Sequence, residues 1–179
     1  SSIHFGATFS YPKTAGPFAT AILITGSGQQ DRDETILNHK PFAVIADYLT
    51  KNGYAVLRVD DRAVGETSFG NVTTATSADF AKDVEAGLAY LMTRKEVDKK
   101  NIGLIGHSEG GLIADIVGSR NKNISFIIML AGTGLKGSTV LADQYEAILL
   151  SSGKDKQTAA AYKALYEKII NNSMEGDTS

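Results

Sequence analysis

The stretch that decides the fold reads Asn101-Ile102-Gly103-Leu104-Ile105-Gly106-His107-Ser108-Glu109-Gly110-Gly111. Its apolar first half predicts a short buried strand that ends near Gly106. In the residues after the turn, from Glu109 to Arg120, apolar side chains such as Leu112 recur at helical spacing, which predicts a helix. The pattern Gly-x-Ser-x-Gly therefore lies between a strand and a helix.

Ser108 is the residue on which this turn is centred. Glycines two residues to either side prevent steric collision across such a sharp turn, where the serine is held in a strained backbone conformation. The serine is expected at the carboxyl end of a strand and the positive end of a helix dipole, where an oxyanion is stabilised. Ser108 is accordingly predicted to be the nucleophile that attacks an acyl carbonyl. The alternative interpretation is a Gly-rich turn with a capping serine.

Strand and helix patterns alternate on both sides of this turn. Predicted strands cover residues 3–10, 18–25, 54–59, 102–106 and 124–131, and predicted helices cover residues 41–51, 77–91 and 109–120. We expect a hairpin from the first two strands, a helix cap from Ser77 and a fully buried last strand. Because parallel strands need crossover connections, the alternation predicts an α/β fold with a mostly parallel, doubly wound sheet. Two further helical segments, residues 139–150 and 156–170, follow, and no strand comes after them.

A second glycine-containing loop, Thr25-Gly26-Ser27-Gly28-Gln29-Gln30-Asp31-Arg32-Asp33-Glu34, follows the predicted strand 18–25. Acyl transfer needs two backbone N–H groups aimed at the developing oxyanion. One comes from the residue after the nucleophile and one from the loop after an earlier strand. The predicted donors are Glu109 and Ser27, with Gly28 as the alternative to Ser27. A plain Gly-Ser turn is the other interpretation of this loop.

Four motifs together carry a family resemblance: Gly26 to Glu34, Asn38-His39-Lys40-Pro41-Phe42, Asp60-Asp61-Arg62-Ala63-Val64-Gly65-Glu66-Thr67 and Gly106 to Gly111. With them the chain resembles the bacterial α/β-hydrolase esterases and the serine-aminopeptidase-like hydrolases over nearly its whole length. Such families usually have Gly where this chain has Ala63 and Ser where it has Thr67, and both substitutions are small. The resemblance implies an α/β-hydrolase fold that is incomplete at the C-terminus. Residues 1–136 would be the N-terminal part of the core and residues 137–179 the start of a helical lid.

A serine hydroxyl becomes a good nucleophile only when a histidine takes its proton, and that histidine needs a carboxylate partner. The histidines are His4, His39 and His107, and none follows Ser108, although the family order is Ser, then Asp or Glu, then His. His107 adjoins the serine, but neighbouring strand side chains point to opposite faces. We expect His4 to be structural and His39 to be structural or to contact substrate. The triad Asp and His are therefore expected outside this inactive fragment, in a C-terminal part of roughly 100 residues or more.

Two charged segments, Asp60-Asp61-Arg62 and Asp31 to Glu34, contain carboxylates near the predicted site. We interpret them as a charged network that braces the loops, and not as catalytic acids.

Composition and charge limit the kinds of partner that the chain is expected to bind. With 42% hydrophobic and 21% charged residues, the 179-residue chain is typical of one globular domain. A formal net charge of -2, with acids and bases mixed, provides no basic field for nucleic acid. No apolar run is long enough for insertion in a membrane, and no cofactor or metal is expected. The absence of cysteine fits a cytoplasmic, periplasmic or secreted protein alike.

The function that the sequence favours is a serine hydrolase acting on carboxylic esters of modest size. A serine-aminopeptidase-like enzyme acting on short peptides and a non-catalytic ligand-binding relative are alternatives. A dinucleotide-binding domain is the rival from another class, because Gly26-x-Gly28 follows a strand and Asp60 ends the next one. Against it, Asp31 takes the third glycine position, and the next predicted helix begins only near Pro41, away from the loop.

Overall fold

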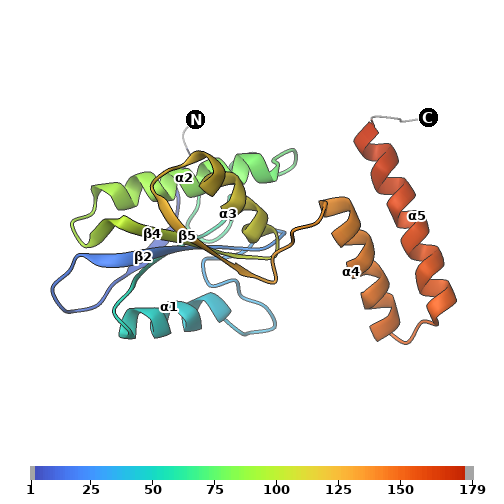
Figure 1. Cartoon of the computed structure of the whole chain (residues 1–179), viewed down its shortest axis with the longest axis horizontal. Helices are drawn as coiled ribbons and strands as arrows, with labels where there is room; N and C mark the ends of the chain where they lie inside the picture. The colour runs from blue at the N-terminus through green and yellow to red at the C-terminus, as the bar shows by residue number, and fades with distance from the viewer. Residues whose placement is uncertain (1–2, 176–179) are drawn as a thin grey trace. The chain divides into compact units, whose positions relative to one another are not determined.

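Five strands form one sheet, in the spatial order β1-β3-β2-β4-β5, in a computed structural model that describes residues 3–175 (Figure 1). The strands are β1 (Ala7–Ser10), β2 (Phe18–Ile24), β3 (Ala55–Val59), β4 (Val97–His107) and β5 (Ile124–Leu130). β3, β2, β4 and β5 run parallel, and β1 pairs antiparallel with β3. The predicted mostly parallel sheet is confirmed.

The predicted hairpin between the first two strands is wrong. β1 pairs with β3, so that Ala7 lies opposite Val59 and Ser10 opposite Val56. β2 instead lies between β3 and β4 and is parallel to both. Its residues are almost all buried, as expected for a central parallel strand, whereas β1 is more exposed. The turn residues between the two strands gave a local hairpin signal, which the non-local pairing of β2 overrode.

Three helices cover this sheet: α1 (Pro41–Lys51), α2 (Ser77–Thr93) and α3 (Glu109–Arg120). Figure 1 shows α1 on one face and α2 and α3 on the other. Successive side chains of a strand point to opposite faces. Ile22 and Leu57 accordingly belong to the core cluster under α2 and α3, and Leu23 and Val56 belong to the cluster under α1. The sheet is thus covered on both faces, as the doubly wound class requires.

Two local predictions about the helices are wrong. The N-cap of α2 is Thr76 and not Ser77, because Thr76 and Asp79 form a capping box. Ser77 is the first helical residue, and its hydroxyl donates a hydrogen bond to the Glu109 carboxylate over 2.7 Å. On α3, Leu112 is 40% exposed and not part of the buried stripe.

β5 also differs from the prediction of a fully buried strand. Its side chains Phe126, Ile128 and Met129 are 36%, 45% and 40% exposed. Among the described strands, β5 pairs only with β4 and forms one edge of the sheet. An apolar sequence alone does not distinguish such an edge strand from a central one.

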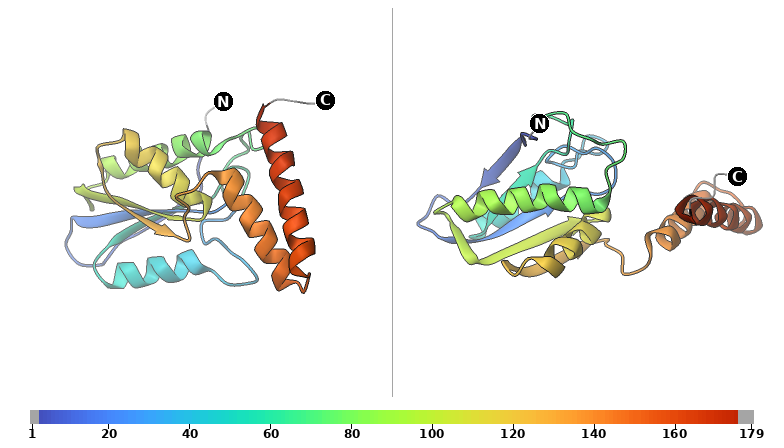
Figure 2. Two further views of the ribbon diagram at one scale, coloured as in Figure 1. Left: turned by 45° about the vertical axis from the view of Figure 1, so that its right-hand side comes forward. Right: turned by 90° about the horizontal axis from the view of Figure 1, so that it is seen from above.

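The chain separates into two compact units, Ser1–Gly132 and Thr133–Ser179, and the sheet lies in the first. Residues 1–2 and 176–179 of the predicted core and lid ranges lie outside the described residues. The second unit contains α4 (Gly137–Ser151) and α5 (Lys156–Glu175), which run side by side in both views of Figure 2.

Aromatic contacts hold α4 and α5 together. Tyr145 stacks on Tyr166, with ring centroids 5.0 Å apart, and meets Tyr162 edge to face. Parts of the predicted apolar stripes, such as Leu141 and Ile169, are about half exposed. No helix within residues 3–175 is long and apolar enough to cross a membrane.

Candidate active site

Ser108 lies at the turn between β4 and α3, with φ 52° and ψ -117°. This backbone conformation is strained for any residue with a side chain. The Ser108 amide donates to the Leu130 carbonyl over 2.9 Å, and the Ser108 carbonyl accepts from the Gly111 amide over 3.0 Å. The predicted strand, sharp turn and helix are therefore present, with the serine on the turn.

Two glycines of the motif permit close contact between backbones at this turn. A Cβ added at Gly106 would lie 2.1 Å from the Gly110 carbonyl oxygen, and one added at Gly110 would lie 2.3 Å from the Ile24 carbonyl oxygen. Both distances are far below van der Waals contact. Glycine at these positions thus lets α3 begin directly against β4 and β2.

The loop after β2 lies against the serine. A Cβ added at Gly26 would be 3.3 Å from the Ser108 Cβ and 3.2 Å from the His107 Nδ1. The Gly26 amide donates to the Glu34 carboxylate over 2.8 Å. Within the described residues, the amides of Ser27 and Glu109 donate no hydrogen bond to another residue. The structure thus places Gly26, the residue before Ser27, against Ser108, and Glu109 directly follows the serine at the start of α3.

Glu34 is a functional candidate that the sequence did not single out. Its side chain is buried, and the same carboxylate oxygen that accepts the Gly26 amide lies 2.7 Å from His107 Nδ1. The backbone of Glu34 has φ 51°, a conformation that non-glycine residues rarely adopt. The sequence indicated only that it belonged to an acidic loop.

The histidines do not complete a triad with Ser108 in the described part of the chain. The His107 Nδ1 lies 2.7 Å from the Glu34 carboxylate. The backbone amide of His4 donates a hydrogen bond to the Ser68 hydroxyl over 2.9 Å, which fits the predicted structural role. His39 forms a backbone bridge with Ile36. Among the described contacts, no histidine side chain forms a hydrogen bond with the Ser108 hydroxyl.

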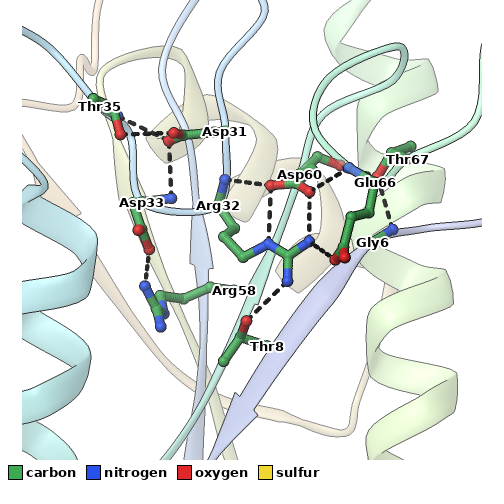
Figure 3. A network of polar contacts seen from close by, with 10 residues as sticks. All are labelled: Gly6, Thr8, Asp31, Arg32, Asp33, Thr35, Arg58, Asp60, Glu66 and Thr67. Carbon is green, nitrogen blue, oxygen red and sulfur yellow. Dashed lines mark hydrogen bonds and ion pairs between the residues drawn. The ribbon is translucent and has the colours of Figure 1, made fainter.

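The two charged segments meet in a hydrogen-bonded network (Figure 3). Asp60 is buried, and its carboxylate accepts the Arg32 amide over 2.7 Å, the Arg32 guanidinium over 2.6 Å and the Glu66 amide over 3.0 Å. Burial raises the pKa of Asp60, but the hydrogen bonds from Arg32 and Glu66 outweigh it and lower this pKa below its ordinary value. Asp33 pairs with Arg58 in the same region. These contacts fix the loop that begins at the oxyanion donors.

We expect Arg32→Lys to lower the free energy of unfolding by about 1–2 kcal/mol. A lysine keeps the charge but loses the forked pair of hydrogen bonds to Asp60, and it leaves a buried carboxylate partly unsatisfied. Urea unfolding measures the change. The matched control is Arg120→Lys, whose partner Glu85 is substantially exposed, and its effect is expected to be near zero. Equal effects of the two substitutions would contradict a bracing role for Arg32.

Asp61 links Thr25, directly after β2, to Gln30 in the loop that follows, which is called the oxyanion loop here for its predicted role. Its carboxylate accepts the Thr25 hydroxyl and the Gln30 amide, both over 2.9 Å. Burial, together with the nearby carboxylates of Asp83 and Glu34, raises the pKa of Asp61 to about 6, against the opposing effect of these hydrogen bonds. An ionised Asp61 is therefore less well tolerated in the folded protein than in the unfolded chain.

This shift predicts a pH dependence of stability. The folded state binds a proton at Asp61 more tightly than the unfolded state, so the Asp61 contribution to stability falls as pH rises from about 4 to about 6. Asp61→Asn removes this contribution. We therefore expect the free energy of unfolding of the wild type, relative to that of the variant, to fall as pH rises across that window. Urea unfolding at a series of pH values measures it. Asp98, whose pKa is lowered by hydrogen bonds from Asn101 and Lys100, is the control: its contribution to stability changes only below about pH 4, so Asp98→Asn should leave the slope between pH 4 and pH 6 unchanged.

A cavity of about 410 Å³ lies beside the oxyanion loop in the first unit. Its lining includes Gly26, Gly28 and Glu109 together with apolar residues such as Val59 and Phe80. Its volume is that of a small-molecule site. Among the described residues, no group of three or more His, Cys, Asp or Glu side chains is arranged to hold a metal ion.

Comparison with known proteins places this geometry in a family. Esterase EstD of Thermotoga maritima is 32% identical over 133 residues, which are 74% of this chain and 31% of that protein. Acyl-coenzyme A thioesterase 3 of Mus musculus is 26% identical over 175 residues, 95% of this chain and 36% of that protein. The chain thus spans about a third of the length of these curated relatives.

The fold has close structural neighbours. Est1E of Butyrivibrio proteoclasticus, solved with ferulic acid bound, superposes with a TM-score of 0.61 at 21% identity, over 79% of this chain and 53% of Est1E. The family pattern of serine aminopeptidase, S33, matches residues 39–171. Because this match includes most of the chain, the chain belongs to the serine aminopeptidase family S33 and has the α/β-hydrolase fold.

Proposed function

We propose that this chain carries the nucleophile and the oxyanion hole of a serine hydrolase that cleaves carboxylic esters of modest size. The observation that carries the proposal is the position of Ser108 in a strained turn against Gly26, while the following amides, those of Ser27 and Glu109, donate to no other described residue. Strain and unused hydrogen-bond donors at one place are typical of a preorganised catalytic site.

In this reaction the Ser108 Oγ attacks the carbonyl carbon of the ester while a general base takes the hydroxyl proton. The carbonyl π electrons move to the oxygen, and the resulting oxyanion accepts hydrogen bonds from the amides of Glu109 and Ser27, with Gly28 as the alternative to Ser27. When the tetrahedral intermediate collapses, the bond from the carbonyl carbon to the ester oxygen breaks, the protonated base gives its proton to that oxygen, and the alcohol leaves an acyl group on Ser108. Water then releases the carboxylic acid by the same sequence of steps.

We propose that the general base and its carboxylate partner come from residues outside this chain. Support comes from the described histidines, of which His107 pairs with Glu34, and from the relatives, which are about three times as long as the matched part. The exposed apolar side chains of β5 also fit a sheet that continues beyond this edge. In that protein, residues 1–136 would be the N-terminal part of the core.

The helical segment 137–179 is proposed to be the start of a lid. Its two described helices, α4 and α5, expose large apolar side chains, including Ile148 and Leu165. Such side chains suit a segment that borders an apolar substrate.

A carboxylic ester is favoured as substrate because the relative with 32% identity is named an esterase. The cavity beside Gly26 and Glu109 has the volume for a small acyl or alcohol group. A peptide is the second candidate, because the family itself is described as serine aminopeptidase. The dinucleotide alternative finds little support, since α1 begins only at Pro41 and no helix starts directly behind the Gly26–Gly28 turn.

Labelling with a fluorophosphonate probe tests the proposal. The full-length protein is expected to gain the probe on the peptide that contains Ser108, and Ser108→Ala is expected to remain unlabelled. A dinucleotide-binding protein or a non-catalytic relative would not react, and an unlabelled wild type would overturn the proposal.

Substrate preference is tested separately, with p-nitrophenyl butyrate as the ester and an aminoacyl p-nitroanilide as the peptide model. We expect kcat/KM to be higher for the ester. The reverse order would favour the peptidase candidate and leave the role of Ser108 intact.

A further inference from the structure

One carboxylate connects the two halves of the candidate oxyanion site. Glu34 Oε1 accepts the Gly26 amide over 2.8 Å and lies 2.7 Å from His107 Nδ1. Gly26 begins the loop that carries Ser27, and His107 directly precedes Ser108. A single buried oxygen therefore contacts both the loop and the turn.

We propose that Glu34 is a positioning residue that sets the geometry of the oxyanion hole by holding the Gly26 peptide. The inference rests on the proposed function of Ser108 and of the Ser27 amide. Holding the Gly26 amide fixes the plane of the Thr25–Gly26 peptide next to Ser108, and the next amide, that of Ser27, has no described hydrogen-bond partner and is left for the substrate. The Gly26 N–H is occupied by Glu34 and does not itself serve as an oxyanion donor.

Two physical reasons make a restraint on the backbone torsions of Gly26 important for the position of the Ser27 amide. Glycine has the widest conformational freedom of any residue, so an unrestrained Gly26 would let the Ser27 amide turn away from the substrate. Gly26 also has little space, since an added Cβ would lie 3.2–3.4 Å from His107, Ser108 and Glu34. Small rotations there would move the loop relative to the nucleophile, and oxyanion stabilisation depends on donor distances being maintained to within a few tenths of an ångström.

The backbone of Glu34 supports a dedicated role for its side chain. Glu34 has φ 51°, and its amide donates to the Asp31 carbonyl over 2.9 Å. A glycine or asparagine adopts this conformation more readily than a glutamate does. The loop thus holds a glutamate in an unfavourable conformation, and the strain is compensated by contacts that the carboxylate makes to Gly26 and His107.

The contact to His107 adds a second link. This hydrogen bond joins the imidazole of His107 to the Glu34 carboxyl group and fixes that group from the side of the nucleophile. Loop and turn are coupled through Glu34 Oε1, although Glu34 and His107 are 73 residues apart in sequence.

The test compares Glu34→Gln and Glu34→Ala with wild type in the full-length protein. For Glu34→Ala we expect kcat for p-nitrophenyl butyrate to fall about 100-fold with KM little changed, because transition-state stabilisation is lost while ground-state binding is not. For Glu34→Gln we expect a smaller fall, about tenfold, since the amide oxygen still accepts the Gly26 N–H but without charge. The rate of fluorophosphonate labelling should fall in the same order.

Asp31→Asn is the matched control. The Asp31 side chain shapes the same loop through the Thr35 hydroxyl and amide and has no described contact with Gly26 or His107, and asparagine keeps the Asp31 backbone carbonyl that accepts the Glu34 amide. Its kcat is expected to remain within about twofold of wild type.

The outcomes are distinguishable. A wild type that fluorophosphonate does not label would overturn the proposed function itself. A labelled wild type together with an unchanged kcat in Glu34→Gln would overturn the role of Glu34, whether or not Glu34→Ala folds. A loss confined to KM in either variant would also overturn it, because an oxyanion-hole defect acts on kcat. A fall in kcat that is large in Glu34→Ala and smaller in Glu34→Gln supports the role.

Discussion

Replacement of Ser108 by alanine is expected to lower kcat for ester hydrolysis by about 10⁴-fold or more in the full-length protein. The hydroxyl oxygen is the atom that forms the acyl-enzyme bond in the proposed reaction, and the described residues of the turn offer no second nucleophile in its place. Some rate above that of water should persist, since the amides of Ser27 and Glu109 remain in position. Steady-state kinetics with p-nitrophenyl butyrate measures the change.

The control is Ser119→Ala, on the same helix α3. Its hydroxyl donates to the Ile116 carbonyl and is exposed, so the substitution should leave kcat unchanged. Ser108→Ala should also unfold close to wild type, because alanine bears the same Cβ at the strained φ of 52°. A Ser108→Ala protein that retains a tenth of the wild-type kcat would contradict the assignment of the nucleophile.

The strand, turn and helix around Ser108 could be predicted from the sequence because the signals are local. Apolar spacing defines β4 and α3, and the glycines at 106 and 110 mark the place where the two elements come into contact. Strand pairing is not local, and the partner of β1 could not be deduced from the residues next to it. β1 pairs with β3, which is about 50 residues away in sequence (Ala7 with Val59).

The same distinction applies to the site. Ser27 and Glu109 were predicted as oxyanion donors because each is adjacent to a recognisable motif, and the structure places Gly26, the neighbour of Ser27, against Ser108. Glu34 was not predicted, because its importance depends on a contact with His107 across 73 residues. An acidic residue in an acidic loop gives no sequence signal of burial. The raised pKa of Asp61 likewise follows from burial and from carboxylates that approach only in the folded chain.

A second large effect is expected for Gly110→Ala, this time on stability. The added Cβ would lie 2.3 Å from the Ile24 carbonyl oxygen and 2.6 Å from the Thr25 carbonyl oxygen, and both are backbone atoms that cannot rotate away. Relief of the overlap requires α3 to move away from β2, which disrupts the core between them. We expect the free energy of unfolding to fall by about 3 kcal/mol or more, measured by urea unfolding.

Gly87→Ala is the matched control, because it also adds a Cβ to a helix that faces β2. There the nearest atom is the end of the Leu57 side chain at 3.3 Å, which can rotate, and alanine favours the helix by about 1 kcal/mol. Gly87→Ala should therefore unfold within about 1 kcal/mol of wild type. The displacement in Gly110→Ala also separates Thr25 and the oxyanion loop from Ser108, so kcat should fall together with stability. A Gly110→Ala protein with wild-type stability and kcat would show that α3 and β2 are not in the close contact on which the oxyanion site depends.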